Sequence, residues 1–222
     1  MEQLQTSKTL SILIVWSVLW LLVAGGSIYI LPDFGADQLN RFYITSAYFL
    51  TFALLGGYYY KLNNMLSHKA PLHRQFIFII LISSALILAC LFINAFFQLN
   101  PEAAKKIILS KFYFPLFQIE TVITKICDVS FQQVFIFGVL KKLKEDQQSD
   151  ERALIFFSLC FFAVHLPLIF SLSPLYAFYF IIPSMFAGLI FSYCILKYRY
   201  GLSMSFAVHL LFYLTIGIYL RA

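Results

Sequence analysis

Charged residues are scarce in this sequence: they make up 12% of its 222 residues, while hydrophobic residues make up 61%. A soluble domain needs roughly a quarter of its residues charged to cover its surface with polar groups. A chain this poor in charge excludes a globular domain surrounded by water, because most of its surface has to face lipid. We therefore expect an all-α membrane protein, with the lipid bilayer as its first partner.

Paired cysteines are also absent. The four cysteines lie singly in apolar runs, with no CxxC pair and no spacing typical of metal ligands, so we interpret them as small packing residues. The net charge is +6, and the basic residues lie mostly in short loops between apolar runs. That placement favours contact with anionic lipid, and we expect no nucleic acid as a partner.

Seven apolar runs follow one another along the chain, each about as long as the ~20 residues that a helix needs to cross the bilayer core. They cover residues 10–31, 42–60, 75–97, 114–140, 153–172, 176–196 and 202–220. No basic region precedes the first run and no cleavage site ends it, so we expect a span and not a signal peptide. The pattern predicts a polytopic bundle of about seven transmembrane helices.

The runs divide one domain into two parts. Residues 1–113 form an N-terminal three-span packing region with a short interfacial segment at 102–111, and residues 114–222 form a four-span core. Ten of the lysines and arginines outside the runs fall on the side of the N-terminus and five on the other side. Because basic loops stay in the cytoplasm, this bias predicts a cytoplasmic N-terminus.

Polar residues interrupt the fourth run, although each ionisable group in hydrocarbon is costly and needs a reason. Several recur at four-residue steps, so they share one helix face, which must look into the bundle. These residues are Glu120, Thr124, Asp128 and Gln132. Lys125 lies three residues before Asp128, and the spacing predicts an ion pair between them.

Two histidines lie in later runs, His165 in the fifth and His209 in the seventh. At about 1.5 Å of rise per residue, Gln132 and Gln133 lie about 12 Å from the cytoplasmic end of their span. By the same rise, His209 lies about 10 Å and His165 about 18 Å from the cytoplasmic ends of theirs. All four side chains fall in one half of the bilayer, so we expect them to meet in a site that opens to the cytoplasm.

These three segments resemble the CPBP family of intramembrane endopeptidases, which includes CAAX-processing proteases and Abi-like bacteriocin-processing or self-immunity proteins. That family carries a Glu-Glu pair followed four residues later by Arg, then Phe-x-x-x-His, then His-x-x-x-Asn, on separate helices. Here Phe161 and His165 match the second motif and His209 the histidine of the third, while Gln132 and Gln133 stand in the place of the first. The resemblance covers roughly residues 114–220 and implies an intramembrane endopeptidase fold.

The departures from the family concern its chemistry. Both glutamate positions hold glutamine, the arginine position holds Phe137, and the final asparagine position holds Tyr213. The resemblance implies that a glutamate activates the attacking water, and a glutamine amide cannot accept that proton. Two substitutes remain: Asp128, one turn before Gln132, or one of the two histidines in its neutral form.

Three functions stay open. The first is a CPBP-like endopeptidase with an altered, active or inactive site, acting on membrane-anchored peptides or proteins through His165, His209, Gln132, Gln133 and Asp128. The second is a non-catalytic protein of the same fold that binds a membrane peptide or partner, as in immunity or scaffolding. The third is a small transporter or channel subunit, for which we find no inverted repeat.

A metal is a further open point. Its ligands would be the two histidines, in a set without the carboxylate or thiolate usual at zinc sites. For all three functions we expect a multi-pass protein of a bacterial inner membrane.

Overall fold

The computed structural model describes residues 2–36, 41–60, 119–146, 148–171 and 174–219, and every regular element in these ranges is a helix. The helices are α1 (Glu2–Gly25), which continues as a π-helical turn (Gly26–Ile30) and a 3-10 turn (Leu31–Phe34), α2 (Phe42–Tyr59), α5 (Ile119–Glu145), α6 (Asp150–Ala163), α7 (Leu168–Ser171), α8 (Pro174–Lys197) and α9 (Gly201–Tyr219). The predicted third span, the interfacial segment at 102–111 and the boundary at residue 113 lie outside the described residues.

Four helical segments are long and apolar enough to cross a membrane: Lys8–Phe34, Ile119–Glu145, Asp150–Phe170 and Phe180–Lys197. This finding supports the membrane class, but the described residues establish four candidate spans and not the seven predicted. Helix α2 has 18 residues, four of them tyrosines that lower its hydropathy. Helix α9 contributes a shorter apolar stretch, Gly201–Thr215.

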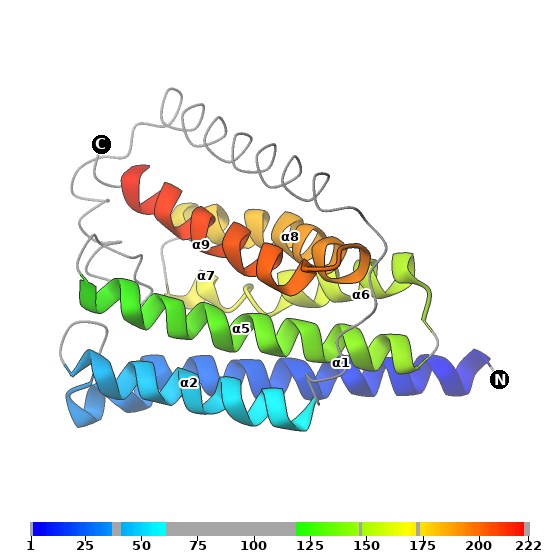
Figure 1. The fold of residues 1–222 in the computed structure, drawn as a ribbon, viewed down its shortest axis with the longest axis horizontal. Helices are drawn as coiled ribbons and strands as arrows, with labels where there is room; N and C mark the ends of the chain where they lie inside the picture. Colours follow the sequence, from blue (N-terminus) through cyan, green and yellow to red (C-terminus); the bar gives the residue numbers. More distant parts are fainter. Residues whose placement is uncertain (1, 37–40, 61–118, 147, 172–173, 220–222) are drawn as a thin grey trace.

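Helix α5 is the centre of the bundle. Of its candidate span 61% is buried within the protein, against 22% of the span at α1, which leaves most of α1 for lipid. The antiparallel helices α1 and α2 lie along one side of α5, and α8 and α9 lie along the other (Figure 1). The polar face predicted for the fourth run therefore lies inside the bundle.

Aromatic side chains fill the space between α1, α5 and α6. Trp16 and Trp20 of α1 lie 5.0 Å apart with their rings tilted by 40°, and Trp20 packs on Phe131 of α5 at 5.6 Å and on Phe161 of α6 at 5.5 Å. The Trp16 indole donates to the backbone carbonyl of Phe135 at 3.0 Å, so its polar edge is satisfied in the core. This cluster fixes α6, and with it the predicted Phe-x-x-x-His motif, against the central helix.

The fifth predicted span is not one continuous helix. Helix α6 ends at Ala163, and residues 164–167 form a turn before α7 begins at Leu168. Pro167 has no amide hydrogen and disfavours helical geometry in the residue before it, which explains the break. The backbone amides of His165 and Leu166 instead bond three residues back, to Phe162 and Ala163. The break places His165 in a turn.

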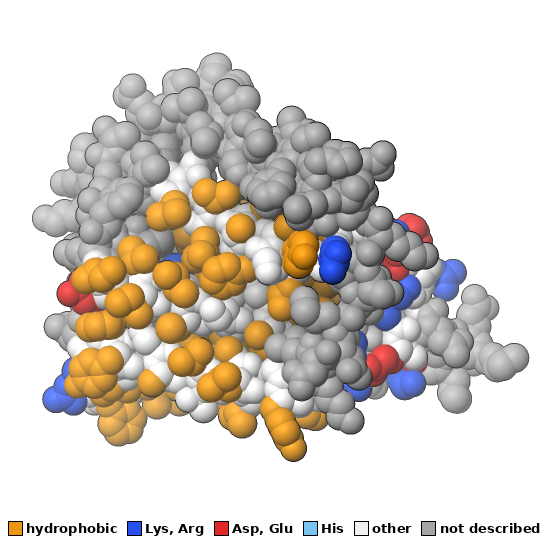
Figure 2. All heavy atoms as spheres, in the orientation of Figure 1, with side chains coloured by type: hydrophobic (Ala, Val, Ile, Leu, Met, Phe, Trp, Pro, Cys, Tyr) orange, Lys and Arg blue, Asp and Glu red, His pale blue; other side chains and the backbone are white. Residues whose placement is uncertain are grey.

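Charged side chains gather at the end of the bundle that holds the N-terminus, while apolar side chains cover the adjoining helix face (Figure 2). Several of them link α1, α5, α6 and α8 in what we term the end network. Its members are Lys8, Thr9, Lys144, Asp146, Gln148, Asp150 and Lys197. This end collects the basic loops that predicted a cytoplasmic side, as far as they are described.

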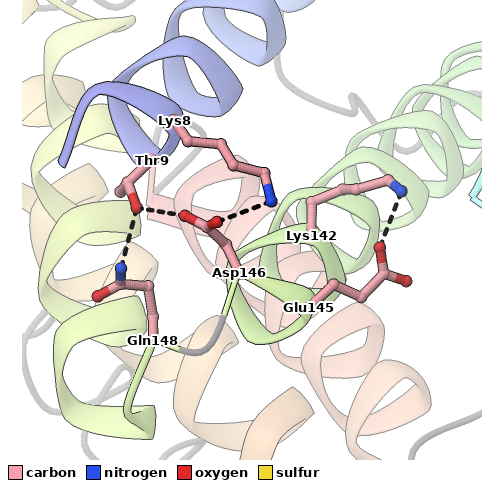
Figure 3. Close-up of polar contacts among 6 residues, drawn as sticks. All are labelled: Lys8, Thr9, Lys142, Glu145, Asp146 and Gln148. Carbon is pink, nitrogen blue, oxygen red and sulfur yellow. Dashed lines mark hydrogen bonds and ion pairs between the residues drawn. The ribbon is translucent and has the colours of Figure 1, made fainter. Parts of the chain in front are cut away.

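Asp146 is the centre of one half of the end network (Figure 3). Its carboxylate accepts from Thr9 at 2.8 Å and pairs with Lys8 at 3.0 Å, and Gln148 donates to Thr9 at 3.0 Å. Burial acts to raise the pKa of Asp146, but the hydrogen bonds from Lys8 and Thr9 prevail and lower it. In the other half, Asp150 pairs with Lys144 and Lys197, each at 2.7 Å.

Candidate functional site

The candidate site lies between α5 and α9, and we term its polar side chains the inner cluster. Its members are Lys125, Asp128, Gln132 and Gln133 of α5 with Ser205, His209 and Tyr213 of α9. The α9 residues follow one another at four-residue steps, so one face of α9 meets the polar face of α5. Apart from the half-buried Tyr213, every member is buried.

One half of the inner cluster is an ion pair. The Lys125 ammonium lies 2.8 Å from Oδ2 of Asp128, and the Gln132 amide donates to Oδ1 at 2.8 Å. Lys125 also lies over the ring of Tyr213, 4.4 Å from its centroid. The predicted pairing of Lys125 with Asp128 is confirmed. Each carboxylate oxygen of Asp128 thus accepts one hydrogen bond, and the ion pair holds the side chain in place.

The other half is a chain of neutral hydrogen bonds. The Ser205 hydroxyl donates to Oε1 of Gln133 at 2.5 Å, and Nε2 of Gln133 lies 3.1 Å from Nδ1 of His209. In the amide orientation that the structure shows, Oε1 of Gln133 faces Ser205 and its nitrogen, which can only donate, faces the imidazole. Nδ1 of His209 therefore accepts, and Nε2 carries the proton. The predicted meeting of Gln133 with His209 across two helices is present in the structure.

Aromatic rings enclose His209. It stacks on Tyr213 at 5.1 Å and lies 4.7 Å from Phe191 of α8. It is also within electrostatic range of Lys125 and His165. The imidazole ring is thus held in one orientation, and its N–H donor is Nε2, because Nδ1 accepts from Gln133.

His165 belongs to a neighbouring layer. Its Nδ1 lies 2.6 Å from the carbonyl oxygen of Phe161, so Nδ1 donates and Nε2 keeps a lone pair. Phe161 contacts His165 at 4.7 Å and Phe191 at 6.0 Å, and Phe191 contacts His209 at 4.7 Å, so aromatic rings link the two histidines. The structure therefore brings Gln132, Gln133, Asp128 and His209 together, and it places His165 beside this group without a hydrogen bond to it.

Two features of the site bear on the open points of the sequence. In the described residues, no group of three or more histidine, cysteine or acidic side chains is arranged to hold a metal ion. Ser205, which fixes the Gln133 amide, was not among the predicted site residues. Its signal was present, because it lies four residues before His209 on the same helix face.

No family model, no curated protein and no solved structure matches this chain. The fold and the site define a class only: a multi-helix membrane protein with a hydrogen-bonded polar cluster between two of its helices. The resemblance to the CPBP endopeptidases therefore depends on the motif residues themselves.

Proposed function

We propose that this protein is a CPBP-like intramembrane endopeptidase-type protein that binds a membrane-anchored peptide at the inner cluster without hydrolysing it. One observation carries the proposal: the Gln133 amide donates to Nδ1 of His209. That contact joins the position of the family's glutamate pair to the histidine of its third motif. By the resemblance, this is the place of the family's peptide-binding site, with an amide where the family has the group that activates water.

The chemistry of the neighbouring groups favours binding over hydrolysis. A general base needs a free lone pair within reach of the water whose proton it takes. Lys125 and Gln132 hold the Asp128 carboxylate on the α5 face, and Nδ1 of His209 already accepts from Gln133. The remaining function of His209 is donation from Nε2, which suits a peptide carbonyl. The lysines of the end network favour an orientation in which the N-terminal end of the bundle lies on the cytoplasmic side of a bacterial inner membrane.

The test uses the full-length protein in lipid nanodiscs with a set of fluorescent single-span and lipidated peptides. Anisotropy measures binding, and mass spectrometry measures cleavage. We expect binding without cleavage, weakened about two- to tenfold by His209→Ala, since one hydrogen bond is worth about 0.5–1.5 kcal/mol. Leu54→Ala, at an exposed position of α2, is the control and should bind as wild type. Binding that is equally strong in His209→Ala would overturn the proposal.

A second candidate is slow hydrolysis with His165 as the base. Nδ1 of His165 donates to the carbonyl oxygen of Phe161, so Nε2 has a free lone pair that could accept a proton from water. Cleavage by wild type that disappears in His165→Ala would favour this endopeptidase over a binding protein. The third alternative, a transporter, would instead give proton flux that depends on Asp128.

A further inference from the structure

An open apolar groove of about 440 Å³ runs along the surface between α1 and α6, away from the inner cluster. Leu10, Ile14 and Leu21 line it from α1, and Leu159 lines it from α6. Leu10, Ile14 and Leu159 are each more than half exposed, so the groove opens outward. In a chain whose α1 is mostly unburied, this outer face is the one that meets lipid.

The length of the groove matches one leaflet of the bilayer. From Leu10 to Leu21 the helix rises about 16 Å, close to half of the ~30 Å hydrocarbon core. The groove begins beside the charged end of the bundle, two residues after Lys8. It therefore extends from the headgroup region of one leaflet to about the bilayer midplane, which is the path of a single acyl chain.

Charge at the mouth of the groove favours an anionic headgroup. Arg152 lies one turn before Phe156, another lining residue, and is exposed. Within the part of the chain that the structure describes, its guanidinium takes part in none of the ion pairs. A basic side chain near the membrane surface attracts anionic lipid by about 1 kcal/mol, or about fivefold in affinity. Lys8 nearby already pairs with Asp146 at 3.0 Å, so the contact with a phosphate falls to Arg152.

The lining favours an acyl chain over a second helix. Helices pack closely in membranes where small residues let the backbones approach, and most residues along this groove are bulky and branched. The two polar side chains of the lining, Ser17 and Cys160, bond to each other at 3.0 Å within the groove. We propose that this groove binds one acyl chain of an anionic phospholipid, with its phosphate at Arg152.

Native mass spectrometry of the full-length protein, titrated with phosphatidylglycerol or phosphatidylcholine, tests this. We expect one saturable phosphatidylglycerol, preferred about fivefold, which is lost when Leu159→Trp fills the groove. Val18→Trp, at another lining position, should act in the same way if the first variant folds poorly. Leu54→Trp, at a similarly exposed site on α2, should retain the lipid.

The headgroup is tested separately. Arg152→Gln should abolish the preference for phosphatidylglycerol, while Arg199→Gln, in the turn before α9, should leave it unchanged. Lipid retained in both groove-filling variants would overturn the proposal. So would a protein dimer that these variants dissociate, because a second copy would then occupy the groove.

Discussion

Two polar regions of this protein use the same kinds of side chain in different surroundings. The inner cluster lies between α5, a candidate membrane span, and α9, and its Lys125 is 7% and its Asp128 9% exposed. In the end network, where the helices finish, Thr9, Asp146 and Gln148 are as buried, but the lysines Lys8, Lys144 and Lys197 are 67%, 33% and 40% exposed. Water can therefore take the place of a lost lysine at the end of the bundle, but hydrocarbon cannot do so inside it.

The two regions differ in how many partners each acidic or imidazole group has. Asp150 of the end network has two lysines, so each one is replaceable. In the inner cluster, Asp128 has one lysine and one amide, and His209 has one amide at Nδ1. A polar network inside the bundle is costly unless every member is satisfied. The comparison predicts that matched substitutions cost much more stability in the inner cluster than in the end network.

The largest effect is expected from Lys125→Met, which leaves the Asp128 carboxylate without its cation inside the bundle. Removing one partner of a buried ion pair costs about 3–5 kcal/mol. Lys197→Met in the end network is the matched control, and an exposed ion pair is worth about 0–1 kcal/mol. Chemical unfolding in detergent measures both.

A second variant separates loss of charge balance from loss of packing. Lys125→Met combined with Asp128→Asn removes both charges and keeps an acceptor for Gln132, so most of the stability should return. If Lys125→Met alone unfolds as easily as Lys197→Met, the two regions do not differ in the way described here.

The sequence predicted the contacts that depend on spacing along one helix. The three-residue separation of Lys125 and Asp128 was sufficient to predict their ion pair, because i,i+3 side chains are neighbours on a helix. Rise per residue placed Gln133 and His209 at similar depths, and the structure joins them by a hydrogen bond. The lysines and arginines that lie in every second loop likewise predicted that the ends of α1, α5, α6 and α8 meet on one side of the bundle.

Contacts that depend on helix rotation or on a break were not predicted. His165 was expected in the same site as His209; it lies in the turn at 164–167 and contacts the inner cluster through the rings of Phe161 and Phe191, without a hydrogen bond to it. Pro167 carried the signal for this break, yet the apolar run continued through it and indicated one span. The face that α6 turns toward the core is set by the packing of Phe161 against Trp16 and Trp20. The sequence around α6 does not contain the information about this packing.

An intermediate effect is expected from Gln133→Leu, which leaves Nδ1 of His209 and the Ser205 hydroxyl without their partner. An unsatisfied buried polar group costs about 1–3 kcal/mol. The same substitution at Gln148 removes a hydrogen bond to Thr9, but the Thr9 hydroxyl still donates to Asp146, so no buried donor loses its partner. Thermal unfolding should rank Gln133→Leu as clearly the less stable, and equal losses would contradict the contrast between the regions.

The smallest effect concerns the pH dependence of the end network. Because the pKa of Asp146 is lowered in the folded protein, its carboxylate adds stability above the unfolded value of about 3.9. That contribution is lost as pH falls through the lowered folded pKa.

Asp146→Asn should therefore unfold more easily than wild type at pH 7, by about 1 kcal/mol or less. This gap in the free energy of unfolding between the two proteins should close in acid. Added salt should narrow the gap at neutral pH, since it screens the exposed Lys8. A gap that persists unchanged below pH ~3 would mean that the Asn side chain disturbs packing and that charge is not the cause.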